Sequence, residues 1–248
     1  QTRIKEEYER VSSEGNENSK IIYGLLAGMF GKKAVMDESW FKEISETYSL
    51  PDLTGIKQQD LFNADGTNIQ QYFFYEDKDG QASFASFIKQ YKDKPGWSIE
   101  DHGNYVVIKS ADVGGKRMEI FANKPTEEAV ENGPAEIQNV FEQRDVESIV
   151  IVHRGHSYHA HKTIARIPSI AKIVSLGSCG GYSNVAAVLE KAPDAHIIST
   201  KGTGTMLVND PLFKMLNEAI LRGDIDWSEF WEKAESTYGK LEAFTNYV

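Results

Sequence analysis

Cysteine is almost absent from this sequence, since Cys179 is the only one among 248 residues. A single cysteine excludes an internal disulfide framework, and it excludes a zinc site built from several cysteines. Long apolar runs are also missing. The longest, residues 21–30, is interrupted by two glycines and is far shorter than the roughly 20 residues that span a bilayer. We therefore expect no membrane span.

Basic residues are the minority, with 27 Lys and Arg against 37 Asp and Glu and a net charge of −10 at pH 7. This balance disfavours non-specific binding to nucleic acid or to an anionic membrane, so we expect neither as a partner. Hydrophobic residues still make up 40% of the chain, which is enough for a substantial core. Because the chain begins at Gln1 and not at Met, we expect a processed or excised piece from which any targeting segment would already be missing.

The chain divides into two regions by its pattern. Residues 1–69 predict an N-terminal helical appendage or a pro-like segment. It would begin with a solvated helix start, continue through a flexible loop over 12–20, and form a helical segment over 21–50 that ends at Pro51. Residues 70–248 alternate short apolar strands with helical segments, which predicts an α/β domain with a mostly parallel sheet covered on both faces. The expected strands are 72–75, 97–99, 105–108, 118–121, 148–152, 172–176 and 196–200. The expected helices are 81–91, 126–144, 160–167, 184–191, 211–221 and 227–235.

In such a sheet, ligands bind beyond the carboxyl ends of the strands. The strand 148–152 runs into V-H-R-G-H-S, and the strand 172–176 runs into G-S-C-G-G. These loops bring a histidine and Cys179 to one edge, as a nucleophile and its base require. His156 is the preferred base because it follows Gly155 just past the strand, and His153 is the alternative.

A metal site and a phosphatase site are two other interpretations of the residues near this edge. The clustered histidines would converge on a metal only if they lay on a helix, so we predict neither a metal site nor a cofactor. The stretch F-F-Y-E-D-K-D-G resembles the nucleophile motif of haloacid-dehalogenase-type phosphatases, with Asp77 as nucleophile and Asp79 as acid/base. G-D-I-D at 223–226 would then supply the magnesium carboxylates. Gln81 stands where that motif has Thr, which disfavours this alternative.

The His and Cys loops together resemble the catalytic core of the clan CD cysteine peptidases, which include caspases, legumains, gingipains and separases. The resemblance is closest to the separase and CHAT side, where only a short helix separates the His loop from the Cys strand. It implies a three-layer caspase-like α/β/α sandwich, a Cys179–His156 dyad, no catalytic cofactor, and cleavage of a peptide or protein substrate after a selected P1 residue. A catalytically weak binding or scaffold domain of the same fold is the second possibility.

The resemblance also bears on the surrounding loops. Backbone N–H groups near Gly155, Ser157 and Gly180 would hold the oxyanion, although the family usually has Gly where Ser157 stands. Lys201, in S-T-K-G-T-G, and Asp210 are the candidates for a substrate pocket. Since Arg-selective members carry acidic residues there, the specificity of the family does not transfer to this chain.

Overall fold

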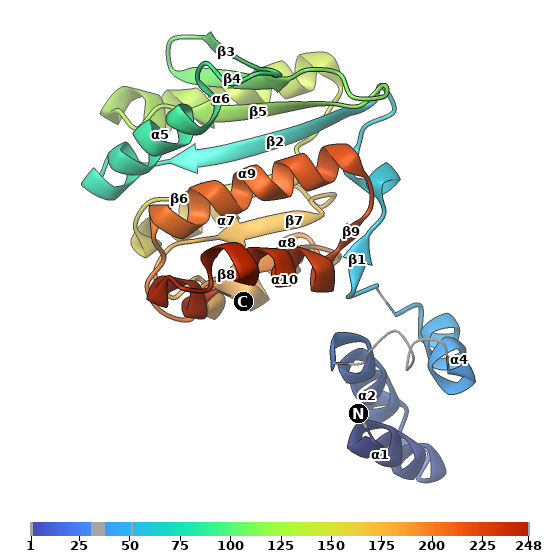
Figure 1. Ribbon diagram of the computed structural model, residues 1–248. Helices are drawn as coiled ribbons and strands as arrows, with labels where there is room; N and C mark the ends of the chain where they lie inside the picture. The colour runs from blue at the N-terminus through green and yellow to red at the C-terminus, as the bar shows by residue number, and fades with distance from the viewer. Residues whose placement is uncertain (1, 31–37, 51, 248) are drawn as a thin grey trace. The chain divides into compact units, whose positions relative to one another are not determined.

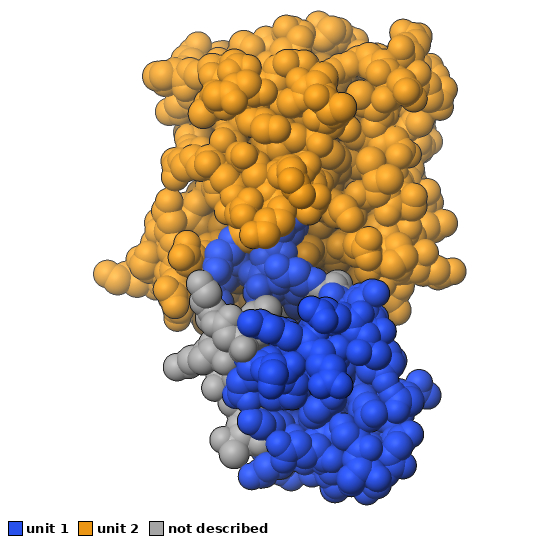
Figure 2. Space-filling model, turned by 90° about the vertical axis from the view of Figure 1, so that its right-hand side faces the viewer, with its two compact units in different colours: residues 1–56, 226–228 blue, residues 57–225, 229–248 orange. Residues whose placement is uncertain are grey.

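The computed structural model describes the chain except for residues 1, 31–37, 51 and 248. The described residues form two compact units, coloured separately in Figure 2. The first contains residues 1–56 and 226–228, and the second contains residues 57–225 and 229–248.

The first unit is helical, with α1 (Thr2–Ser13), α2 (Glu17–Phe30), α4 (Ser39–Tyr48) and the short strand β1 (Gly55–Ile56). Its core contains Ala27, Phe41 and Ile44. The loop predicted over 12–20 is wrong for most of its length, because only residues 14–16 separate α1 from α2. The Asn16 side chain accepts a hydrogen bond from the Ser19 N–H and so caps α2. The helix end predicted at Pro51 lies outside the described residues.

The second unit is built on one mixed sheet, which within the described residues has seven strands in the order β3-β4-β5-β2-β6-β7-β8 (Figure 1). The strands are β2 (Thr67–Phe74), β3 (Trp97–Asp101), β4 (Tyr105–Ser110), β5 (Arg117–Asn123), β6 (Val150–Arg154), β7 (Ile173–Leu176) and β8 (His196–Ser199). Pairing is parallel from β5 to β8, while β3, β4 and β5 pair in an antiparallel manner. The predicted mixed α/β class with a mostly parallel sheet is confirmed.

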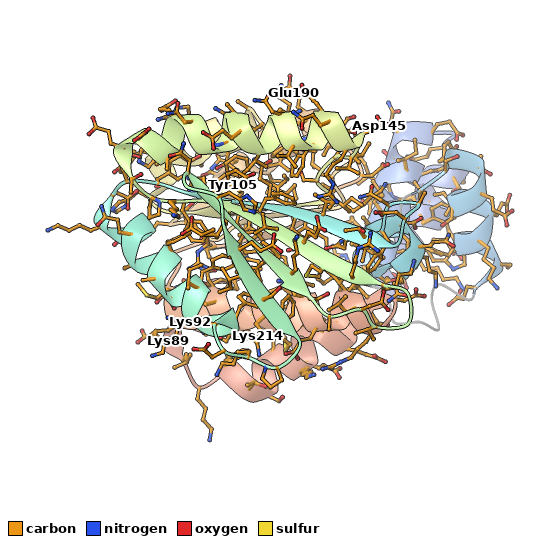
Figure 3. The ribbon with its side chains drawn as sticks, turned by 90° about the horizontal axis from the view of Figure 1, so that it is seen from above. Lys89, Lys92, Tyr105, Asp145, Glu190 and Lys214 are labelled. Atoms are coloured by element: carbon orange, nitrogen blue, oxygen red, sulfur yellow. The ribbon has the colours of Figure 1, made fainter. Side chains whose placement is uncertain are left out.

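Helices cover both faces of this sheet, as Figure 3 shows from above. The main ones are α5 (Lys78–Tyr91), α6 (Glu127–Arg144), α7 (Ala160–Ile164), α8 (Val185–Lys191), α9 (Met206–Arg222) and α10 (Trp227–Tyr238). Short 3-10 turns, η2 (Ser157–His159) and η3 (Gly181–Asn184), follow β6 and β7, and the two-residue strand β9 (Ile225–Asp226) follows α9. The helix predicted over 126–144 is confirmed, since α6 continues through Pro134, and α9 begins five residues before Pro211.

The alternation of side chains along β2 separates the two helical layers. Tyr72 packs against Phe87 of α5 and Phe213 of α9, with ring centroids 5.1 and 6.0 Å away. Phe73 and Tyr75 point to the other face, where they join the core cluster formed with α6, α7 and α8. The second unit is therefore a helix–sheet–helix sandwich.

Parallel pairing fixes where the loops gather. The strands β2, β6 and β7 all run in one direction and end at Phe74, Arg154 and Leu176. The loops that follow them hold the Asp77–Asp79 segment, the histidine cluster and Cys179, so these residues share one edge of the sheet.

Candidate active site at the carboxyl edge of the sheet

A cavity of about 180 Å³ lies at this edge, and both His156 and Cys179 line it. Each of the two residues follows one of the neighbouring strands β6 and β7. Both side chains are exposed. The other lining residues are Asp79, Ser83, Arg154, Gly155, Gly177, Ser178, Gly204, Thr205, Met206 and Asn209. The structure therefore places the predicted nucleophile and the preferred base in the same cavity.

The Cys179 loop is held by hydrogen bonds to the chain beyond β8. The Gly180 N–H donates to the Gly202 carbonyl at 2.9 Å, and the Tyr182 N–H donates to the Thr200 carbonyl at 3.0 Å. The Thr200 hydroxyl donates in turn to the Ser178 carbonyl. Because the Gly180 amide is already engaged, it is not available to an oxyanion, and Gly180 does not line the cavity.

The histidines of the loop after β6 lie in different environments. His153 is completely buried, with Nδ1 2.8 Å from the Thr163 hydroxyl and Nε2 3.2 Å from the His156 carbonyl oxygen. Burial lowers its pKa to about 4. Both ring nitrogens are engaged and the ring is shut off from the cavity, so His153 does not suit the role of alternative base. His161 lines a different cavity, of about 480 Å³.

A carboxylate partner of His156 lies close in space although it is far away in the sequence. His156 Nε2 is 3.1 Å from Asp79 Oδ2, in the first turn of α5. A proton held on Nε2 by this carboxylate leaves Nδ1 as the nitrogen that can accept a proton. The position of D-K-D-G directly after a strand that ends at the same edge could have indicated that Asp79 lies beside the histidine loop. From the sequence, we considered Asp79 only as a phosphatase residue.

The carboxylates that the phosphatase alternative requires lie at opposite edges of the sheet. Asp77 and Asp79 lie at the carboxyl edge, and Asp77 caps α5 by accepting the Gly80 N–H at 2.8 Å. Asp224 instead pairs with Lys57 at 2.9 Å and accepts the Gln58 N–H, ahead of the amino end of β2. Asp224 therefore does not supply a magnesium ligand beside Asp77 and Asp79.

The predicted substrate-pocket residues lie outside the wall of the cavity. Lys201 is exposed and does not line it. Asp210 is buried behind the wall, where it forms an ion pair with Arg154, which does line the cavity. The side chains of Arg154 and Asp210 are only 3% and 1% exposed. Breaking such a pair would leave one charge buried and uncompensated, so the two residues fix each other beneath the cavity.

Comparison with known proteins adds no family assignment. No protein-family model matches the sequence, and no curated protein matches it at a significant level. Among the described residues, no helix is long and apolar enough to cross a membrane.

Proposed function

We propose that this chain is a cysteine endopeptidase with a caspase-like fold. In this proposal Cys179 is the nucleophile and His156 is the general base and acid. The observation that carries it is the shared cavity, which His156 and Cys179 line from the ends of adjacent parallel strands. The proposal is also supported by the carboxylate of Asp79, which lies beside His156 Nε2 and favours the tautomer with a free Nδ1.

The reaction would follow the usual course of thiol catalysis. His156 Nδ1 takes the proton of the Cys179 thiol, and the sulfur attacks the scissile carbonyl carbon. A carbon–sulfur bond forms, the carbon–nitrogen bond breaks, and the leaving amine receives the proton from His156. Water then attacks the thioester, giving its proton to His156, and the acid product leaves as the thiol is restored. The residue Asp79 is a positioning residue in this scheme, because it acts through the imidazole.

A positive environment or backbone donors are needed where the oxyanion develops. The Cys179 N–H and the N–H groups of the loop that begins at Gly155 are the candidates. Gly155 has a backbone φ of 149°, and a Cβ there would lie 3.2 Å from the Tyr75 ring, so the loop relies on glycine at this position. The Ser157 N–H remains a candidate donor even though the family usually has Gly at this position.

The test is a peptide library that varies the P1 residue, assayed on the full chain. Cys179→Ala should abolish cleavage and labelling by iodoacetamide. His156→Ala should lower kcat/KM by at least about 100-fold, the range of lost general acid–base catalysis. The matched control is His161→Ala, which removes a neighbouring exposed histidine from a different cavity and should stay near the wild-type rate.

Full activity in the Cys179→Ala variant would overturn the proposal. A wild-type chain that cleaves no peptide, and whose Cys179 labels no faster than a free thiol, would favour the binding or scaffold alternative. Magnesium-dependent phosphatase activity that survives Cys179→Ala and is lost in Asp77→Asn would favour the phosphatase alternative.

A further inference from the structure

Three potential metal ligands converge at the proposed catalytic pair, and one of them is His156 itself. Asp77, Asp79 and His156 offer ligand atoms that all lie within 4.8 Å of one another. They come from three places: the loop after β2, the first turn of α5 and the loop after β6. His156 and Asp79 are exposed, so their side chains can adjust to an ion that brings ligands to about 2.0–2.2 Å.

An independent observation at Asp77 points to a bound cation. Its Oδ1 accepts the Gly80 N–H, but its Oδ2 accepts no hydrogen bond within the described residues, although the side chain is only 10% exposed. His159 Nε2 is 3.5 Å from Oδ2 without forming a hydrogen bond to it. A carboxylate oxygen that is removed from water and left without a donor is unfavourable, unless a positive charge compensates it.

We propose that Asp77, Asp79 and His156 bind a divalent transition-metal ion of the zinc type, and that the bound ion switches off the Cys179–His156 pair. One imidazole nitrogen with two carboxylates is a donor set that suits Zn²⁺. Mg²⁺ and Ca²⁺ favour oxygen ligands alone, so they should bind weakly here.

The switching effect follows from the tautomers of His156, and this part of the inference rests on the proposed peptidase function. Without metal, Asp79 favours the proton on Nε2, and Nδ1 can accept the proton of the thiol. A metal ion on Nε2 takes the place of that proton, so the neutral ring must carry its hydrogen on Nδ1. His156 then has no lone pair for Cys179, and the base is lost while the fold is unchanged.

Direct titration tests the site without relying on activity. Full-length Cys179→Ala is titrated with zinc against a chromophoric chelator, and it should bind one ion as tightly as wild type. Asp77→Asn should weaken binding at least tenfold, because the amide oxygen can still cap α5 while the anionic oxygen is gone. Asp79→Asn should weaken it similarly. The control is Glu76→Gln, an adjacent exposed acidic residue outside the set, which should bind like wild type.

The outcomes separate this inference from the proposed function. Absence of stoichiometric zinc binding, or binding that is lost in Cys179→Ala but kept in Asp77→Asn, would overturn the site. With active wild-type enzyme, zinc should inhibit peptide cleavage and a chelator should restore it. Inhibition that persists unchanged in Asp77→Asn would overturn the switch. If wild type cleaves no peptide, the switch fails together with the proposed function, whereas the titration still decides the metal site.

Discussion

His153 and His156 are three residues apart, yet they occupy opposite environments. The sequence offers both as bases, since each stands near the end of a strand. The structure buries His153 completely between Thr163 and the His156 carbonyl, and leaves His156 exposed beside Asp79. The difference follows from where β6 ends: His153 lies within the strand, whose five residues are all buried, and His156 lies in the exposed loop beyond Arg154.

Burial of His153 predicts how stability depends on pH. Its pKa falls to about 4 in the folded chain from an ordinary 6.5, because burial disfavours the imidazolium. Below pH 6.5 the unfolded chain binds a proton that the folded chain refuses, so stability falls as the pH drops from 6.5 towards 4. Between pH 7 and pH 5 we expect a loss of about 2 kcal/mol from this residue.

Urea unfolding at the two pH values measures the effect. His153→Gln, which retains a hydrogen-bonding side chain but cannot titrate, should reduce the pH-dependent loss by that amount. The exposed His161→Gln serves as the control and should leave the pH dependence as in wild type. Identical pH dependence in wild type and His153→Gln would contradict the assignment.

At the scale of elements, the turn after β7 determines where the thiol lies. A Cβ at Gly181 would collide with the backbone carbonyl oxygen of Leu176, which cannot move without shifting the strand end. Gly180, its neighbour, has a φ of 66° but open space around it. Gly181 is therefore required because a side chain has no space there, and Gly180 is required because of its left-handed backbone conformation.

Alanine at each position separates the two requirements. Gly180→Ala should lower the free energy of unfolding by about 1 kcal/mol, the strain of a left-handed residue. Gly181→Ala should cost more, about 2–3 kcal/mol, because the turn must be displaced to relieve overpacking. Thermal unfolding of the two variants measures the order, and an equal or reversed order would show that the turn yields easily at Gly181.

At the scale of the whole second unit, a buried polar network ties the sheet to one helical layer. Asn217 of α9 donates to the hydroxyls of Tyr91 on α5, at 2.9 Å, and Tyr72 on β2, at 3.3 Å. Its oxygen accepts from Gln70 of β2 at 2.9 Å. All four residues are nearly or fully buried. Of the polar side-chain atoms of these four residues, only the Gln70 oxygen lacks a hydrogen bond within the described part of the chain, so the network is nearly complete.

Asn217→Leu should therefore destabilise the fold by about 1–3 kcal/mol, because it leaves the buried Tyr91 hydroxyl without its donor and removes one acceptor of the Gln70 amide nitrogen, which keeps its hydrogen bond to Asn68. Chemical denaturation followed by circular dichroism measures this. Lys214→Ala, on the solvent-facing side of the same helix, should change stability by no more than about 0.5 kcal/mol. A loss below 1 kcal/mol in Asn217→Leu would mean that the core repacks around the leucine.

The same network involves the part of β2 that the sequence did not predict. The strand was predicted over 72–75, where the sequence is rich in aromatic residues. The observed β2 begins at Thr67, and all eight of its residues are buried. One acceptor of the Gln70 amide nitrogen, Asn217, is 147 residues away in the sequence, so no local pattern could show that this nitrogen finds that partner in the core.

The sequence by itself determined the alternation of strands and helices, the mostly parallel sheet, and the edge to which Cys179 and the histidines belong. Those properties depend on local hydrophobic patterning and on the direction of parallel strands. Only the tertiary structure decided which histidine faces the cavity, that Asp79 lies beside it, and that Asp77 holds an unpartnered oxygen. These depend on contacts between β2, α5 and β6, elements that are adjacent in space because the sheet order differs from the chain order.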